Sequence, residues 1–390
     1  MSQQTADRAH DANGGRAPTR LLRVGTWLLK APGETDKKVL VNSLMEALRG
    51  DARVLEVRPP EFNDYWTLRR TFYPDSARST QSAVRTGADA FEVLQLSEFV
   101  GFTVRVPIKN QEPHQGTADI PSDTYWVAWD GVTILVMWEQ EGDWVPISGG
   151  HIVQQVLDDV LAPVGCGLYI QSCSPGCDFL FVHETLLLTL ADDVEDFNLR
   201  RVPGTRALLY AAERRYSDPL VEVDLVALSL SADMAIFAMF KNVGRRLIDL
   251  EHFAREDFAH LLSHYHEHTS LVAEGKSPKV LLARWNNRHW RKEAWALISG
   301  VWLAMANIET LRRIWNSERG SLAEAAQIQS MLTRDTARDV ESVEALDLDP
   351  IAETVNQVTA ALNNQTSVRA AALGALAGGL AGGATGLLGG

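Results

Sequence analysis

Hydrophobic and polar positions in the first half of the chain alternate mainly as they do in β-strands. Strands are predicted at residues 21–29, 53–57, 98–107, 167–173 and 178–190, and the apolar period is near two in residues 98–107. Residues 124–128 and 132–138 flank a tight Asp130-Gly131 turn, so they predict a hairpin. The second strand of this hairpin is apolar on both faces, which is typical of a central strand.

Two stretches of this region follow the helical period instead. Apolar residues spaced three and four apart predict helices over residues 36–48 and 149–164. Residues 59–86 mix proline, aromatic and arginine residues and give no assignment. The pattern predicts an α+β fold class, with a mostly antiparallel N-terminal sheet domain that carries a helix.

After Pro203 the pattern becomes helical. Helices are expected over residues 205–216, 220–272 and 279–319. We expect Gly320 to end the third of these, and Ser321 with Glu324 to form a capping box for the next. Pro350 follows Asp349 as the first residue of a long C-terminal helix. The carboxylates Asp224 and Asp233 indicate that residues 220–272 form a buried helix and not a membrane span.

These patterns divide the chain into four segments. Residues 1–19 are polar and predict a disordered leader, and residues 20–197 predict the α+β domain, with a sensing or binding role. Residues 203–349 predict an all-α helical domain. Residues 350–390 predict a terminal helix that ends in a Gly/Ala-rich tail over 370–390.

Glycines recur every four residues in this tail, at Gly374, Gly378, Gly382, Gly386 and Gly390. On a helix they would form a flat groove, and the apolar side chains opposite would be Leu373, Leu376, Leu380 and Leu387. Such rows let helices approach closely in lipid, and 21 helical residues would be roughly 31 Å long, close to a bilayer core. Because glycine is a poor helix former, a flexible tail or packing within the protein are the alternatives.

Composition restricts the classes of function. The chain has 390 residues, of which 46% are hydrophobic and 22% charged, and its formal net charge is −13. This negative charge argues against nucleic-acid binding. The polar first 20 residues contain no signal peptide, and three cysteines do not suggest a secreted disulfide framework. We therefore expect a cytoplasmic protein that associates with the inner membrane through its tail.

One cluster has the residue types of a metal site. The chain carries Cys166, Cys173 and Cys177 within 12 residues, and His183 follows them. Thiolates and an imidazole around a turn could bind zinc, although only Cys173 and Cys177 have the usual close spacing. Ordinary buried cysteines are the alternative, and no other cofactor is expected. The sequence contains no phosphate-binding loop, nucleophile elbow or paired catalytic carboxylates, so no catalytic residue is predicted.

A second cluster combines indoles with basic side chains in residues 284–302. Its candidate interface residues are Trp285, Trp290, Trp295, Arg284, Arg288 and Arg291, with Trp302 beyond them. Indoles and cations together suit a membrane interface. Core packing with cation–π contacts is the alternative.

The functional hypothesis is a non-enzymatic, membrane-associating protein that forms homo-oligomers. Its sharpest version is an oligomerising anchor or a pore-forming effector of a bacterial defence or self-destruct system, with a protein partner bound at the N-terminal domain. One alternative is a soluble interaction or scaffold protein whose tail packs on itself or on a partner. Another is a zinc-dependent binder or enzyme centred on the cysteine hairpin.

Overall fold

The computed structural model describes 13 stretches of the chain, namely residues 19–30, 37–60, 68–74, 79–111, 122–140, 149–161, 164, 168–170, 180–190, 198–201, 207–212, 217–273 and 290–363. The chain divides into two compact units. Unit 1 comprises residues 1–74, 90–244 and 314–341, and unit 2 comprises residues 75–89, 245–313 and 342–390. The strands belong to unit 1 and the described part of unit 2 is helical, which confirms the α+β fold class.

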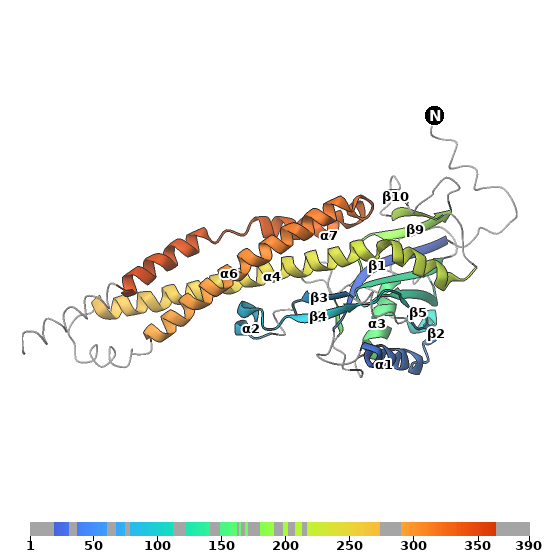
Figure 1. Ribbon diagram of the computed structural model, residues 1–390, viewed down its shortest axis with the longest axis horizontal. Helices are drawn as coiled ribbons and strands as arrows, with labels where there is room; N and C mark the ends of the chain where they lie inside the picture. The colour runs from blue at the N-terminus through green and yellow to red at the C-terminus, as the bar shows by residue number, and fades with distance from the viewer. Residues whose placement is uncertain are drawn as a thin grey trace, which may run out of the picture. The chain divides into compact units, whose positions relative to one another are not determined.

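Unit 1 is built on a large sheet (Figure 1). Its strands are β1 (Thr19–Leu29), β2 (Val54–Arg58), β5 (Val100–Arg105), β6 (Thr124–Trp129), β7 (Thr133–Gln140), β8 (Leu168–Ile170), β9 (Thr185–Leu190), β10 (Asn198–Arg201) and β11 (Ala207–Ala212). They are ordered β10-β11-β9-β1-β7-β6-β5-β2, and β8 pairs with β1. The pairing of β11 with β9 is parallel, and the other pairings of this sheet are antiparallel. A separate ribbon pairs β3 (Leu68–Phe72) with β4 (Phe91–Gln95).

Two amphipathic helices cover one face of the sheet. They are α1 (Lys37–Gly50) and α3 (Gly150–Leu161), and Figure 1 shows both on the same side of the strands. Each buries one stripe, because apolar residues three and four apart share a face. The stripes pack on alternate residues of the strands, including Phe102, Val136 and Trp138, all fully buried.

The opposite face of the sheet packs against the first part of α4 (Pro219–Ala273). Ala235 and Ala238 of this helix lie in one cluster with Leu28, Phe72 and Val132. Strand β7 is therefore buried on both faces, as its apolar pattern predicts. The predicted turn before it also forms: Gly131 has φ of 90°, and the Asp130 carboxylate accepts the backbone N–H groups of Val132 and Thr133.

The long helices pass through both units along the chain. Helix α4 contributes residues up to 244 to unit 1 and the rest to unit 2. Helix α6 (Trp290–Glu324) begins in unit 2, and α7 (Ala326–Glu344) lies mainly in unit 1. Unit 2 also contains the short helix α2 (Gln81–Thr86) and the helical residues 349–363. Its buried apolar residues include Leu247, Leu250, Ala254, Leu261, Ala294, Ile298, Val301, Ala304, Ile308, Ile351 and Val355.

The expected helix over residues 205–216 is wrong. Residues Ala207–Ala212 form strand β11, which pairs with β9 in parallel register, with Leu208 opposite Leu186. Alanine and leucine are strong helix formers, so local propensity favours a helix for this stretch. The hydrogen-bonding edge that β9 offers overrides that preference, as tertiary context often does.

The expected end of the third helix at Gly320 is also wrong. Helix α6 continues through Gly320 to Glu324, and Ser321 lies inside it, where its hydroxyl donates to the Ser317 carbonyl oxygen at 3.2 Å. Ser321 is therefore not the N-cap of a new helix, since α7 begins at Ala326. One helical glycine costs about 1 kcal/mol, and the burial of Trp315 and Leu322 on either side offsets it.

Candidate functional site

The exposed face of α6 in unit 2 is the first candidate site. Residues 294–308 of this helix include no charged side chain, and one side of the stretch packs into the core of unit 2. The other side is exposed. It carries Trp295 and Trp302, with 40% and 39% of their surfaces accessible, and Leu303 at 41%. We call the exposed set Trp295, Ala296, Ser299, Trp302, Leu303 and Ala306 the indole face.

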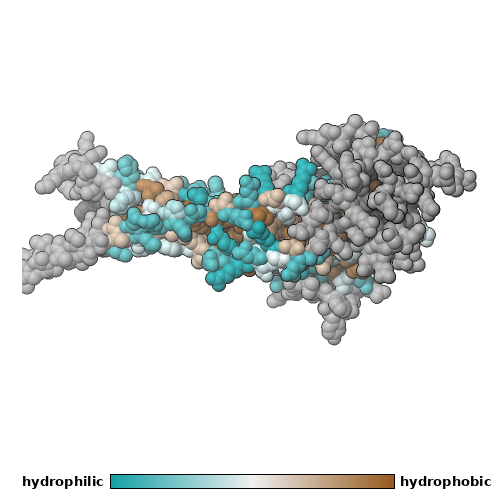
Figure 2. Space-filling view, turned by 90° about the horizontal axis from the view of Figure 1, so that it is seen from above, coloured by the Kyte–Doolittle hydropathy of each residue, from teal (hydrophilic) through white to brown (hydrophobic). Residues whose placement is uncertain are grey.

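Helical geometry explains why these side chains share a face. Residues three, four and seven apart lie one above another on a helix. Isolated exposed leucines and valines are normal on a protein surface, but two indoles one heptad apart within an uncharged stretch are not. Figure 2 shows, on the side of the molecule that it presents, how hydrophobic residues are interspersed with hydrophilic ones along the described helices.

Charged side chains mark both ends of the indole face. Lys292 and Glu293 are exposed before it, and after it an ion pair joins Glu309 Oε1 to Arg313 Nη2 at 3.2 Å. The 15 uncharged residues are about 22 Å long, which is shorter than the roughly 30 Å of a bilayer core. The uncharged stretch can therefore lie on a membrane or against another helix, but it cannot cross a bilayer by itself.

Two of the described helices are long and apolar enough, by length and composition, to cross a membrane: Pro219–Glu267 in α4 and Lys292–Glu324 in α6. Core helices of soluble proteins meet the same criterion. Half of the most apolar stretch of α4 is buried within the protein, and the corresponding share for α6 is 39%. A smaller share of the apolar stretch is therefore buried within the protein in α6 than in α4.

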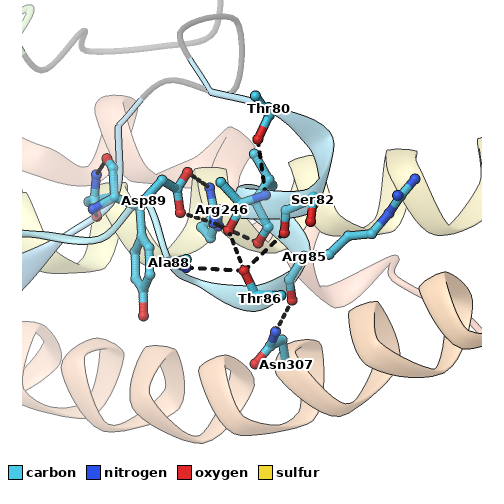
Figure 3. Close-up of polar contacts among 12 residues, drawn as sticks. Thr80, Ser82, Arg85, Thr86, Ala88, Asp89, Arg246 and Asn307 are labelled. Carbon is cyan, nitrogen blue, oxygen red and sulfur yellow. Dashed lines mark hydrogen bonds and ion pairs between the residues drawn. The ribbon is translucent and has the colours of Figure 1, made fainter.

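A clamp of charged groups holds the short helix α2 in unit 2 (Figure 3). Arg246 of α4, whose side chain is 1% exposed, binds both carboxylate oxygens of Asp89, at 2.9 and 2.6 Å. The same guanidinium donates to the Val84 carbonyl oxygen at 2.6 Å, near the C-terminus of α2. Asn307 of α6 donates its side-chain amide to the Arg85 carbonyl oxygen. We call these contacts the α2 clamp, and they join α2 to both long helices of unit 2.

Asp257 extends the clamp into the contact between α4 and α6. Its Oδ1 accepts from Arg85 Nη2 at 2.6 Å, and among the described residues its buried Oδ2 has no hydrogen-bond partner. A Cβ atom at Gly300 of α6 would lie 2.7 Å from that Oδ2, so glycine is what allows this close approach. Burial raises the pKa of the Asp257 carboxyl, and the positive charge of Arg85 opposes the increase.

Unit 1 contains a second group of buried charges. Lys241 of α4 donates to an Asp339 carboxylate oxygen and, at 2.9 Å, to the Asp335 carbonyl oxygen. The fully buried side chain of Asp335 accepts from the backbone N–H of His183 at 3.2 Å and lies 2.5 Å from its Nδ1. This contact favours the tautomer with hydrogen on Nδ1, so Nε2 is the nitrogen that can accept a proton or bind a metal.

Of the four predicted zinc ligands, only His183 lies in the part of the chain that the structure describes. His183 is paired with Asp335, while Cys166, Cys173 and Cys177 lie outside the described residues. Across the described ranges, no three His, Cys, Asp or Glu side chains are arranged to hold a metal ion. Binding of zinc by these cysteines stays a prediction.

A third titratable group lies at the β2–β5 edge of unit 1. Asp224 of α4 approaches Gly101, where a Cβ atom would be 3.5 Å from its Oδ1. Burial raises the pKa of Asp224 to about 7, the charge of Arg58 lowers it, and Asp218 raises it further. Asp218 itself binds Arg58 at 2.5 Å, and this hydrogen bond lowers the pKa of Asp218.

The remaining predicted site residues belong to residues 284–302 and to the C-terminal tail. Trp290 is 7% exposed and belongs to the core of unit 2, whereas Trp295 is on the surface. The predicted stretch therefore holds both a core and a surface indole. Outside the described residues, or with side chains that are not described, are Trp285, Arg284, Arg288, Arg291 and the whole tail of residues 370–390.

Sequence reasoning missed the buried charges of these two groups, which are Asp89, Lys241, Arg246, Asp257, Asp335 and Asp339. The sequence gives one indication of them, because Asp335 and Asp339 are four residues apart and so share a helix face. Their cation lies 94 to 98 residues away along the chain. No local pattern indicates such a pairing. Comparison of the chain with protein-family models, with curated proteins and with solved structures found no match.

Proposed function

We propose that this protein is a non-enzymatic, cytoplasmic protein that associates with the inner membrane. The indole face of α6 carries the proposal. Its two indoles and Leu303 lie on one exposed side of an uncharged stretch, and basic side chains stand near both ends, at Lys292 and Arg313. Tryptophan favours the headgroup region of a bilayer, because its ring is apolar and its N–H can be hydrated there.

In this proposal α6 lies parallel to the membrane surface. The uncharged stretch is too short to span a bilayer, and its opposite side packs into unit 2. Each indole exposes roughly 60–100 Å², and removing that area from water is worth about 2 kcal/mol. The net charge of −13 gives no general attraction to anionic lipid, so apolar insertion must provide most of the binding energy. Binding should therefore persist at high salt.

The glycine-patterned tail supplies a second contact in the same proposal. Residues 370–390 have the length and the small-residue rows of a helix that packs with copies of itself in lipid. Their placement lies outside the described residues, so the argument for the tail rests on sequence alone. An oligomerising anchor and a pore-forming effector both follow from this combination.

The test is flotation of the full-length protein with liposomes, beside a double Trp295→Ser/Trp302→Ser variant. We expect the variant to bind at least tenfold more weakly, because both indoles leave the lipid contact. Leu228→Ser is the matched control, since Leu228 is 59% exposed on α4 in unit 1. A chain ending at Val368 measures the contribution of the tail. If the native protein does not float, or the double variant floats equally well, the indole face has no role at a membrane.

A soluble interaction protein is the second candidate. The excess of acidic residues and the short length of the indole face favour it, because both features suit a protein partner better than an anionic bilayer. This function predicts that the native chain stays soluble at all lipid concentrations. The zinc-dependent alternative predicts about one equivalent of zinc in protein purified without chelator.

A further inference from the structure

We propose that the indole face of α6 pairs with the same face of a second copy of this chain, with the two helices antiparallel. The inference does not depend on membrane association, because the pairing forms in water. It starts from the spacing of the exposed residues on α6. The positions are Lys292, Trp295, Ser299, Trp302, Ala306, Glu309 and Arg313, all exposed.

These seven positions are separated by three and four residues in strict alternation. That spacing is the 3.5-residue repeat of a coiled-coil seam, in which each helix presents a straight row of side chains to a partner. Asp257 of α4 lies against the other side of α6 at Gly300, and Ile298, Val301 and Ile308 are buried on that side. The seven exposed positions therefore form a second packing surface of α6, separate from the side that already packs within unit 2.

Side-chain size along the row favours the antiparallel arrangement. Large Trp295 and Trp302 alternate with small Ser299 and Ala306. With the symmetry axis between Ser299 and Trp302, Trp302 of each copy lies opposite Ser299 of the other, and Trp295 lies opposite Ala306. Each indole therefore faces a small side chain across the seam. A parallel arrangement would set tryptophan against tryptophan at every large layer and leave gaps at the small ones.

Charge at the ends of the row favours the same arrangement. In the antiparallel pair, Lys292 of each copy lies near Glu309 of the other, within the reach of a lysine side chain. Glu309 already binds Arg313 of its own chain at 3.2 Å, so each end would form a three-membered ion network. Parallel pairing would set Lys292, Glu309 and Arg313 each against its own copy, which is repulsive. The interface is isologous, as in most homodimers.

The first experiment measures the mass of the full-length protein by sedimentation velocity in lipid-free buffer across a range of concentrations. We expect a dimer, and we expect Ala306→Lys to raise its dissociation constant at least 100-fold, because a charge would enter the centre of the seam. Ala306 is exposed, so the helix content of the variant should not change. Ile314→Lys, which adds the same charge at an exposed position of α6 off the seam, is the control. A monomeric native protein, or a dimer that Ala306→Lys leaves intact, overturns the proposal.

The second experiment determines the direction of the helices by disulfide formation. Trp295→Cys and Ala306→Cys chains are prepared separately and oxidised alone or as a mixture. In the antiparallel dimer only the mixture should cross-link efficiently, because two copies of one position lie about 16 Å apart along the axis. The unaltered chain measures the background from its three native cysteines. Cross-linking of each variant alone, with none gained on mixing, would show a parallel pair and contradict the arrangement.

The two proposals fail separately. Loss of the dimer in lipid-free buffer leaves membrane association untouched, since flotation measures it independently. A dimer that forms as described in a protein that does not float removes membrane association and keeps the dimer.

Discussion

The two units of this protein differ in where most of their described tryptophans lie. In unit 1 the indoles of Trp27, Trp129, Trp138 and Trp315 are at most 1% exposed. In unit 2, helix α6 turns Trp295 and Trp302 outward, while its inward positions include Ala294, Gly300 and Ala304. Unit 1 therefore fills its core with large aromatic side chains. In the described part of unit 2, Gly300 lets α6 approach Asp257 of α4, and buried ion pairs join Arg246 to Asp89 and Arg85 to Asp257.

This difference indicates what each set of indoles is for. A large side chain in a core lowers the free energy of the folded state by the area it buries. A large side chain on the surface does not lower that free energy, because little of its area is buried. Binding is the better explanation for its presence. The comparison yields four predictions.

The largest expected effect comes from removing a core indole of unit 1. Trp138→Ala should lower the free energy of unfolding by about 4 kcal/mol, because it leaves a cavity beside Phe102, Val136 and Tyr125. Trp302→Ala in unit 2 should change it by less than about 1 kcal/mol. Urea unfolding followed by circular dichroism measures both. Equal losses would contradict the division between core and surface indoles.

Breaking the α2 clamp should have the next largest effect. Arg246→Ala leaves the Asp89 carboxylate buried without its cation, and such a loss costs about 3 kcal/mol. The control is Arg313→Ala, which removes an exposed pair worth about 0.4 kcal/mol. Hydrogen exchange should locate the loss in residues 79–89 and the neighbouring turns of α4. Unchanged protection there would mean that the clamp does not stabilise α2.

The same substitution at two glycines of α6 should have opposite signs. Gly300→Ala should destabilise unit 2 by about 1–2 kcal/mol, because the new Cβ would meet the Asp257 carboxylate that Arg85 holds in place. Gly320→Ala should stabilise the protein by about 0.5–1 kcal/mol, since nothing lies within 4 Å and alanine favours the helix. Thermal unfolding of the two variants measures the difference. Stabilisation by both would show that α4 and α6 are not closely packed at Gly300.

The last prediction is a pH dependence from Asp224, whose effect appears only at higher pH. Its pKa in the folded protein is about 7, above the ordinary value of 3.8, because burial disfavours the charged form. Its contribution to stability is therefore full below the ordinary pKa and is lost as the pH rises through about 7. Asp224→Asn should be more stable than the native chain at pH 8, by about 1–2 kcal/mol after allowance for solvent screening. The difference should shrink by pH 5, and a constant difference between pH 5 and 8 would contradict the assignment.

Much of the fold could be predicted from sequence because its signals are local. The hairpin around Asp130 follows from a turn dipeptide between two apolar runs, and α1 and α3 follow from helical spacing. Strand β11 could not be predicted, because its Ala- and Leu-rich residues favour a helix until β9 supplies a pairing edge. The length of α6 was misjudged at Gly320 for a similar reason, since burial on both sides of the glycine decides the outcome.

The candidate site was less predictable than the fold. The sequence singles out the stretch from Arg284 to Trp302 as unusual. Its sequence does not tell which indoles face inward, because that depends on the side of α6 that α4 covers, and Trp290 and Trp295 differ for this reason. The buried ion pairs join residues 98 to 202 positions apart, and periodicity carries no information over such separations.

The α2 clamp also sets an order of events during synthesis. Asp89 precedes Arg246 by 157 residues, so at a typical 5–20 residues per second the carboxylate leaves the ribosome about 8 to 30 seconds before its cation. Strands β4 to β11 are translated within that interval. Unit 2 consequently cannot finish folding until most of unit 1 has been made, and no contiguous fragment of the chain contains unit 2 alone.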